Sequence, residues 1–205
     1  MSTHTENEDL TTGQAVRAEA LESILVDKGI LSDTEVDNFI ETWSSRIGPM
    51  IGAGIVARAW MDDGFKQRLL VDATAAVTEI GVNPGRLERL EVVINEPGVH
   101  NVVCCTLCSC YPWTLLGLPP GWYKSPEYRA RIVREPRTVL AEMGLDVAEE
   151  TTIQVWDSSA EVRYLVIPQR PAGTENLSED ELAALVTRDS MIGVATIATP
   201  TAATG

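Results

Sequence analysis

The four cysteines of this chain stand close together in the sequence. They are Cys104, Cys105, Cys108 and Cys110, in the run Cys-Cys-Thr-Leu-Cys-Ser-Cys. A C-x-x-C spacing lets two thiolates face one ion across a tight turn. The shorter C-x-C spacing places the backbone amides of Ser109 and Cys110 between two sulfurs, so a metal bound by these sulfurs lies within reach of both nitrogens. The pattern predicts a metal centre.

The types of ligand restrict the choice of metal. If both amides lose their protons, the sulfurs of Cys108 and Cys110 and the nitrogens of Ser109 and Cys110 surround the ion, and Cys105 can cap one axial face. Amidate and thiolate are strong donors, which favour low-spin trivalent cobalt or iron over zinc. The opposite axial face then stays open, and an ion with an open position acts as a Lewis acid rather than as a structural staple.

Other interpretations of the cysteines fit less well. Structural zinc needs four closed ligands, and the chain has only His4 and His100 to add to the cysteines. Iron–sulfur clusters usually need four cysteines, and in an extended chain Cys104 points away from its neighbour Cys105. A disulfide framework is typical of small secreted domains. Inert buried thiols, which pack like small apolar side chains, are the alternative without a metal.

The cysteines belong to a longer series of motifs. The series includes Val-Val-Cys-Cys-Thr-Leu-Cys-Ser-Cys-Tyr-Pro-Trp at 102–113 and Leu-Gly-Leu-Pro-Pro at 116–120. Further members are Val-Arg-Glu-Pro-Arg at 133–137, Val-Trp-Asp-Ser-Ser at 155–159, Pro-Gln-Arg-Pro-Ala-Gly-Thr at 168–174 and Thr-Arg-Asp-Ser-Met-Ile-Gly-Val at 187–194. From about Leu21 to Val194 the chain resembles the α subunit of the nitrile hydratases, most specifically at the cysteine loop.

The resemblance implies a hydro-lyase that adds water across a nitrile to give an amide. It implies a metal held by Cys105, Cys108 and Cys110 and by the backbone amides of Ser109 and Cys110. In the family the two later cysteines are oxidised, so the resemblance makes Cys108 a sulfinic acid and Cys110 a sulfenic acid. Cys105 is then the unmodified axial thiolate. The catalytic residues that the resemblance implies are Cys110 and Cys108.

The resemblance also implies a particular metal and particular partners. Thr106 and Tyr111 are similar to the cobalt branch of the family, so Co(III) is expected and Fe(III) is the alternative. Family members pair with a β subunit to form an αβ unit, which doubles to an α2β2 heterotetramer. They receive cobalt from an activator protein, and their substrate is a small nitrile. No Arg or Lys lies between Arg89 and Lys124, so arginines of the β subunit are expected to balance the charge of the oxidised sulfurs.

Two other functions share part of this pattern. Thiocyanate hydrolase γ-type subunits resemble this chain at the same loop but tend to carry Arg where it has Trp113. A non-catalytic, α-like metal-binding protein is the other alternative. The chain also departs from the nitrile hydratase pattern at Cys104, where Val is usual, and at Arg86, where iron-type subunits have Gln. Neither position belongs to the implied ligand set.

Composition limits the classes of partner. A chain of 205 residues with a net charge of −14 is long enough for one good core. The acidic balance argues against nucleic acid, whose binding depends on basic surfaces. No apolar run approaches the ~18 residues of a membrane span, and the acidic start is unlike a secretory signal. A cytoplasmic protein that binds neither nucleic acid nor membrane is expected.

The pattern of apolar residues predicts an α+β fold. A disordered start (1–11) precedes a helical arm (12–81), an α/β-layered metal-binding domain (82–195) and a loose tail (196–205). In the arm, helices are expected over 12–28, from a capping box at 32–35 onward, over 53–61 and over 64–80. The second of these has apolar residues at helical spacing and no local sheet, so a partner surface is expected to cover them. They are Val36, Phe39, Ile40, Trp43 and Ile47.

The metal-binding domain is expected to contain strands and short helices. Strands are predicted at 90–94 and 99–103, the second of which delivers the chain into the cysteine loop. Segments 152–156 and 162–167 are predicted to form a hairpin. Helices are predicted over 125–134 and 138–143, and a last helix begins after Ser178.

Several other residues near these elements have ordinary interpretations. His100 is expected to be a structural group, and Asp157 and Glu161 are expected to be turn and surface residues. Aromatic residues beside the loop either wall a pocket or pack beneath it; they are Tyr111, Trp113 and Trp122. A basic patch is expected to form salt bridges with carboxylates; it consists of Arg129, Arg131, Arg134 and Arg137.

Overall fold

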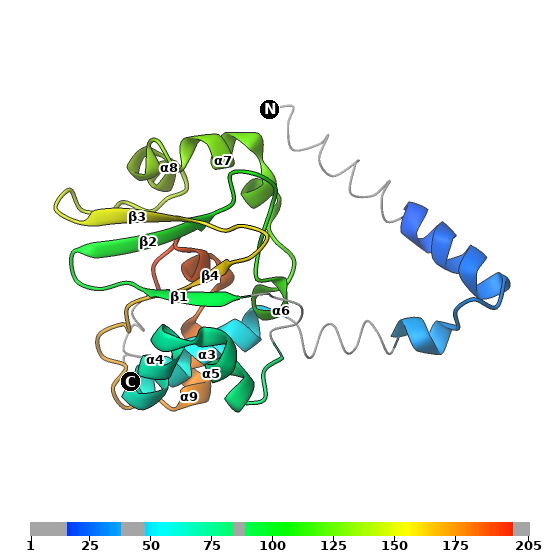
Figure 1. Ribbon diagram of the computed structural model, residues 1–205, viewed down its shortest axis with the longest axis horizontal. Helices are drawn as coiled ribbons and strands as arrows, with labels where there is room; N and C mark the ends of the chain where they lie inside the picture. The colour runs from blue at the N-terminus through cyan, green and yellow to red at the C-terminus, as the bar shows by residue number, and fades with distance from the viewer. Residues whose placement is uncertain (1–15, 38–47, 84–88, 199–205) are drawn as a thin grey trace, which may run out of the picture. The chain divides into compact units, whose positions relative to one another are not determined.

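The computed structural model describes residues 16–37, 48–83 and 89–198 (Figure 1). The chain divides into two compact units, Met1–Ser45 and Arg46–Gly205. The second unit carries the cysteines. In the described part of the chain, no helix combines the length and the apolar character needed to cross a membrane.

The first unit is helical over 16–27 and 33–37. Gly29, with a φ of +64°, ends the first helix as predicted. The predicted capping box is confirmed, because the Ser32 N–H donates to Glu35 Oε2 at 2.8 Å and the Glu35 N–H donates to Ser32 Oγ at 3.3 Å. Leu21 and Ile24 are 58% and 51% exposed. Most of the predicted apolar stripe lies outside the described residues, namely Phe39, Ile40, Trp43 and Ile47.

The described part of the second unit contains two pairs of parallel strands. Strand β1 (Leu90–Ile94) pairs with β4 (Arg163–Ile167), and β2 (Val99–Cys104) pairs with β3 (Thr152–Asp157). The predicted strand positions are confirmed, but the predicted hairpin between β3 and β4 is wrong. Each of these strands pairs with an earlier one instead. A parallel pair needs a long crossover connection, and residues 105–151 supply it between β2 and β3.

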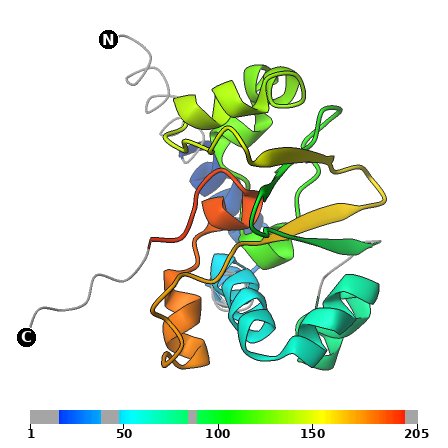
Figure 2. The same ribbon diagram turned by 90° about the vertical axis from the view of Figure 1, so that its left-hand side faces the viewer.

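Helices lie on two sides of these strands (Figures 1 and 2). On the side of β2 and β3 are α7 (Pro126–Arg131) and α8 (Pro136–Glu142). On the side of β1 are α3 (Pro49–Met61), α4 (Asp63–Val71), α5 (Ala73–Glu79) and α9 (Glu179–Leu185). The predicted α+β class, with helices layered around strands, is confirmed.

The helices before β1 belong to the same compact unit as the strands. Helices α4 and α5 contact β1, and α3 contacts α9 from the other end of the chain. Their apolar side chains, such as Ile55, Phe65 and Val77, are fully buried. The units divide between Ser45 and Arg46, whereas the sequence pattern ends the arm at residue 81. The two positions differ because the pattern at 81 marks a change of secondary structure within one folding unit.

Two aspartates set the boundaries of the helices in this region. Asp62 Oδ1 accepts a hydrogen bond from the Phe65 N–H at 2.9 Å, and Asp72 Oδ1 accepts one from the Ala75 N–H at 2.9 Å. Each side chain satisfies a free amide at the start of a helix. The segment predicted as one helix over 64–80 is therefore two helices, α4 and α5, which meet at Asp72.

The segment after the cysteines contains short helices that the sequence pattern predicts only in part. Helix α6 (Trp113–Leu116) and the 3₁₀ helix η1 (Gly121–Lys124) are not predicted. Helix α7 ends at Arg131, before its predicted end at 134. The capping box at Ser178 is confirmed. Helix α9 is not the last one, however, because α10 (Arg188–Ile192) follows and contacts β4, β2 and α3.

A buried network of hydrogen bonds joins β2 to β3 and to the end of α10. His100 Nε2 lies 2.7 Å from the Gly193 carbonyl oxygen, and His100 Nδ1 lies 3.3 Å from Asn95 Nδ2. Asn95 Oδ1 accepts from the Asn101 N–H at 2.7 Å, and Trp156 Nε1–H donates to Asn101 Oδ1 at 2.8 Å. Burial lowers the pKa of His100, and a neutral ring that donates through Nε2 and accepts at Nδ1 satisfies both contacts. His100 is a structural group, as expected.

Candidate metal centre

The cysteine loop starts where β2 leaves its partner strand. Cys104, the last residue of β2, lies opposite Asp157, the last residue of β3. The Ser158 N–H donates to the Cys104 carbonyl oxygen at 2.8 Å. The pairing ends there, and the following residues form a loop. Strand β2 thus leads into the cysteine loop, as predicted, and the loop lies at the carboxyl end of the β2–β3 pair.

The loop brings three sulfurs together. Cys108 Sγ lies 3.6 Å from Cys105 Sγ and 3.1 Å from Cys110 Sγ. All three sulfurs lie within 4.8 Å of one another. Cys105 and Cys110 are buried, whereas Cys108 is exposed. This arrangement can hold one ion near the protein surface through soft sulfur donors.

Backbone amides also point at the sulfurs. The Cys108 N–H donates to Cys105 Sγ at 3.4 Å. The pKa of Cys108 is lowered to about 7, chiefly by the hydrogen bond from the Cys110 thiol and then by those from the Ser109 amide, the Cys105 thiol and the Cys110 amide. Donors of this kind stabilise a thiolate. Between Cys108 and Cys110, Cys108 is therefore the sulfur that more readily carries a negative charge.

Burial raises the pKa of two other thiols, those of Cys110 and Cys104. Burial, followed by the hydrogen bond to the Cys108 sulfur, raises the pKa of Cys110 to about 12. Burial, followed by the nearby Asp157 carboxylate, raises the pKa of Cys104 to about 12 as well. Among the described residues, Cys104 is not part of the three-sulfur group. Cys104, one of the positions at which the chain departs from the family pattern, is thus a buried, protonated thiol outside the cluster.

Asp157 anchors the cysteine loop, a role that the sequence analysis missed. Its Oδ1 accepts a hydrogen bond from the Thr106 N–H at 2.9 Å, and its Oδ2 accepts one from Thr106 Oγ1 at 2.5 Å. The expectation that Asp157 is an ordinary turn residue is wrong. The parallel pairing of β2 with β3 sets Asp157 opposite Cys104 and next to the loop. No spacing signal in the sequence marks this contact, since it depends on which strand β3 pairs with.

Three backbone carbonyls in and before the loop are held by side chains of η1 and α7. Tyr128 Oη donates to the Val103 carbonyl oxygen at 2.8 Å, and Tyr123 Oη donates to that of Cys110 at 2.9 Å. Arg129 Nη1 donates to the Cys108 carbonyl oxygen at 2.6 Å. These contacts fix the path of the loop in addition to the anchor at Asp157.

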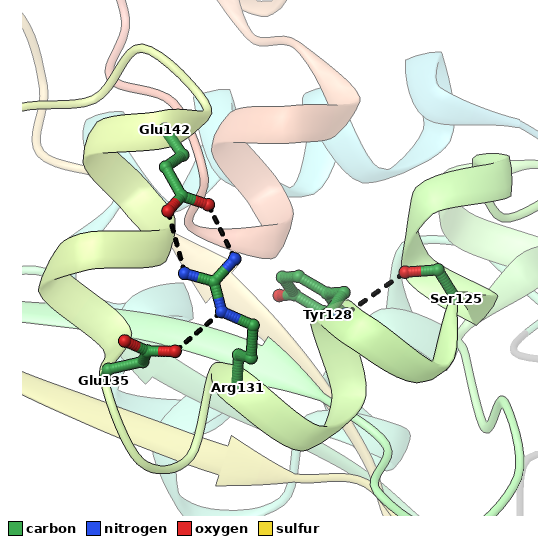
Figure 3. A network of polar contacts seen from close by, with 5 residues as sticks. All are labelled: Ser125, Tyr128, Arg131, Glu135 and Glu142. Atoms are coloured by element: carbon green, nitrogen blue, oxygen red, sulfur yellow. Dashed lines mark hydrogen bonds and ion pairs between the residues drawn. The ribbon is translucent and has the colours of Figure 1, made fainter. Parts of the chain in front are cut away.

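A polar network holds α7 in place (Figure 3). Ser125 Oγ accepts a hydrogen bond from the Tyr128 N–H at 3.1 Å and caps the helix. Arg131 forms ion pairs with Glu135 at 2.6 Å and with Glu142 of α8 at 2.7 Å. The network ties α7 to α8, so the tyrosine and arginine that hold the loop extend from an anchored helix.

Arginines of this chain lie around the cysteine loop. The expected pairing with carboxylates is confirmed for Arg131, but Arg129 donates to the Cys108 carbonyl and Arg137 donates to backbone carbonyls near Val147. Burial raises the pKa of Cys110, and the charge of Arg163 offsets only part of this increase. The contact of Arg129 with the loop was not predicted, because it joins residues that are 21 positions apart in the sequence.

The aromatic residues next to the loop pack against one another. Tyr111 and Tyr123 meet edge to face with ring centres 5.0 Å apart, and Trp122 and Tyr128 meet in the same way at 4.9 Å. Tyr111 is buried, whereas Trp113 is 36% exposed. For Tyr111 and Trp122, packing beneath the loop is therefore the observed role. Trp113 remains at the surface.

The chain is an α+β protein with a loop of three cysteines that could hold a metal ion, and known proteins are similar to it. The family model described as nitrile hydratase, alpha chain, matches residues 12–195. The low-molecular weight cobalt-containing nitrile hydratase subunit alpha of Rhodococcus rhodochrous is 57% identical over 189 residues, covering 92% of this chain and 91% of that one. The chain belongs to the nitrile hydratase alpha-chain family.

Two other relatives are informative about the metal and the reaction. The solved structure of a double mutant of Fe-type nitrile hydratase from Comamonas testosteroni Ni1 matches with a TM-score of 0.83 at 42% identity, covering 95% of this chain and 97% of that one. The thiocyanate hydrolase subunit gamma of Thiobacillus thioparus is 42% identical, covering 86% of this chain and 76% of that protein. The fold is thus shared by proteins named for different metals and different substrates.

Proposed function

We propose that this chain is the α subunit of a nitrile hydratase, which adds water across the carbon–nitrogen triple bond of a nitrile to give an amide. The observation that carries the proposal is the loop in which three sulfurs lie within 4.8 Å of one another and two backbone amides donate to the middle sulfur. Membership of the nitrile hydratase alpha-chain family supports the same reaction.

The donors present fit a low-spin trivalent ion. Cys105, Cys108 and Cys110 are the sulfur ligands in this proposal, and the backbone amides of Ser109 and Cys110 are the nitrogen ligands. The thiolate character of Cys108 and the direction of the two amides support this set. An ion bound there would supply Lewis-acid chemistry toward the nitrile. The exposed position of Cys108 leaves the site accessible from solvent.

Cys108 and Cys110 are the proposed catalytic residues. With oxygen atoms from dioxygen or a peroxide, Cys108 becomes a sulfinic acid and Cys110 a sulfenic acid, and Cys105 stays a thiolate. Oxidation follows thiolate character and access, and Cys108 has both. The oxygen on Cys110 would then serve as the nucleophile or as the base in the hydration of the nitrile. Peptide mass spectrometry of active protein should find two added oxygens on Cys108 and one on Cys110; unmodified thiols in fully active protein would refute the assignment.

Cobalt is the proposed metal. Thr106 and Tyr111 fit the cobalt branch, and a relative that is 57% identical is named as cobalt-containing. Iron is the alternative, because a Fe-type enzyme shares the fold at 42% identity. Expression with cobalt and iron both supplied should give stoichiometric cobalt by elemental analysis. Stoichiometric iron or zinc with little cobalt would contradict the proposal.

The proposed partners are a β subunit, in an α2β2 heterotetramer, and a cobalt-inserting activator protein in the cytoplasm. Exposed apolar side chains of the first unit, such as Leu21 and Ile24, support a covering partner. The exposed edge of the cysteine loop supports a partner surface there too. Light scattering should find a heterotetramer for the co-expressed complex but not for the chain alone. A nitrile-hydration assay on both samples should find most of the activity in the complex. A lone chain that hydrates nitriles at the rate of the complex would contradict this.

The decisive assay separates the proposed reaction from its two alternatives. A thiocyanate hydrolase would hydrolyse thiocyanate, and a non-catalytic metal-binding protein would act on neither substrate. Trp113 stands where thiocyanate hydrolases tend to carry Arg, which supports nitriles as the substrate. The cobalt-loaded complex should convert acetonitrile or benzonitrile to the amide and leave thiocyanate largely unchanged. The opposite preference would favour the thiocyanate hydrolase.

A further inference from the structure

Arg129 contacts the loop peptide that joins Cys108, a proposed sulfur ligand, to Ser109, a proposed nitrogen ligand. Its Nη1 lies 2.6 Å from the Cys108 carbonyl oxygen, 21 residues away in the chain. The carbonyl of Cys108 and the nitrogen of Ser109 belong to the same peptide group. Arg129 Nε is buried and has no hydrogen-bond acceptor among the described residues. Nη1 is therefore the atom through which this guanidinium holds the loop.

The other carbonyls held from η1 and α7 receive neutral donors. The carbonyls of Val103 and Cys110 accept from the hydroxyl groups of Tyr128 and Tyr123. Their peptide nitrogens belong to Cys104 and Tyr111, neither of which is a proposed ligand. The charged donor is thus placed on the carbonyl whose peptide nitrogen is a proposed ligand.

The chemistry of a metal-bound peptide explains this placement. A peptide nitrogen that binds a metal releases its proton to solvent, and resonance spreads the resulting negative charge onto the carbonyl oxygen. A hydrogen bond between an ionised donor and a charged oxygen is roughly twice as strong as a neutral one. A guanidinium is always charged and has a rigid, planar set of donors, so Arg129 supplies a fixed positive charge at the atom where negative charge accumulates.

We propose that Arg129 is a positioning residue for the metal centre, which orients the Cys108–Ser109 peptide and stabilises it in its anionic, metal-bound form. The inference rests on the proposed function, because it takes the Ser109 nitrogen as a ligand. The anchoring of α7 supports it. Ser125 caps the helix, and Arg131 ties the helix to Glu142 (Figure 3). The guanidinium of Arg129 therefore reaches the loop from a fixed backbone.

The test compares three variants of the cobalt-loaded, co-expressed complex. Arg129→Met removes the charge and the donor, and Arg129→Lys keeps the charge. Arg134→Met is the matched control, since it removes the same charge from an exposed side chain in the segment after α7. The readouts are cobalt content, the rate of cobalt loss to EDTA and the energy of the sulfur-to-cobalt absorption band. The melting temperature of each complex shows whether it is folded.

Arg129→Met should lose cobalt on the order of 10- to 100-fold faster than the wild type, as expected for the loss of a charge-assisted hydrogen bond, and its absorption band should shift. Arg129→Lys should lose cobalt more slowly than Arg129→Met, and Arg134→Met should match the wild type. Equal rates and bands in Arg129→Met and Arg134→Met would overturn the inference. So would equally fast loss from the Lys and Met variants, which would assign the effect to packing rather than to charge.

Measurements on the wild-type complex distinguish a failure of the proposed function from a failure of the role proposed for Arg129. A wild-type complex that binds no cobalt, or that binds cobalt and hydrates no nitrile, contradicts the proposed function. A wild-type complex that binds cobalt and hydrates nitriles, together with an Arg129→Met complex that has unchanged cobalt loss and an unchanged band, contradicts the role of Arg129 alone.

Discussion

Replacing Gly193 by alanine should destabilise the protein strongly, because the end of α10 lies directly on the backbone of β2. Gly193 has a φ of +90°. A Cβ at this position would lie 2.0 Å from the Asn101 carbonyl oxygen and 2.9 Å from Val102 Cα. Carbon–oxygen contacts normally begin at about 3.3 Å. The two backbones would therefore have to separate by about 1 Å, or the turn after α10 would have to change its conformation.

The expected cost has two parts. A left-handed backbone costs alanine about 1–2 kcal/mol. Separation of α10 from β2 also breaks the 2.7 Å hydrogen bond between His100 Nε2 and the Gly193 carbonyl, and an unpaired buried polar group costs about 1–3 kcal/mol. The free energy of unfolding should thus fall by about 2–5 kcal/mol, which corresponds to a decrease of about 5–15 °C in melting temperature for a unit of this size.

Gly144→Ala is the matched control for this experiment. Gly144 also has a φ of +90°, but a Cβ there would meet nothing within 4 Å. Gly144→Ala therefore measures only the cost of a left-handed backbone, about 1–2 kcal/mol. This cost is partly offset because alanine makes the unfolded chain less flexible. Circular dichroism melts of both co-expressed complexes at one protein concentration measure the difference. If the two variants melt at the same temperature, the contact between Gly193 and β2 does not stabilise the fold and the reasoning fails.

Three further predictions concern residues around the site and the buried network. Cys104→Val should retain cobalt and activity, because Cys104 is buried outside the three-sulfur group; a metal-free or inactive variant would make it a functional residue. Asp157→Ala removes both hydrogen bonds to Thr106. The variant should lose cobalt on the order of tenfold faster, because two partly exposed hydrogen bonds contribute about 1–2 kcal/mol. Glu161→Ala, a few residues away, is the control and should match the wild type. Burial lowers the pKa of His100 below its ordinary 6.5, so the neutral ring is favoured by folding. This contribution is present above pH 6.5 and is lost as the pH falls through the folded-state pKa. Melts between pH 7.5 and 5 should show a smaller acid-side decrease for His100→Gln than for the wild type, and parallel curves would contradict the assignment.

Much of the local structure and the chemistry of the loop follow from neighbours in the sequence. The capping boxes at Ser32 and Ser178 are confirmed because each needs residues only three positions apart. The strands at 90–94 and 99–104 have the predicted positions, because runs of apolar, β-branched residues favour extended backbone. The convergence of sulfurs from Cys105, Cys108 and Cys110 likewise depends on a short stretch of chain. The sequence therefore determined the type of site and the strand that carries it.

Tertiary structure alone decided what surrounds that site. The pairing of β3 with β2, rather than with β4, places Asp157 against Thr106 across 51 residues of sequence. The packing of α7 against the strands places Arg129 on the Cys108 carbonyl. Such contacts depend on strand partner, register and helix packing, which are set by burial of the whole apolar core. A hairpin between β3 and β4 satisfies the local pattern equally well, so no short-range signal distinguishes the two pairings, and the residues that support the metal loop become visible only in the folded chain.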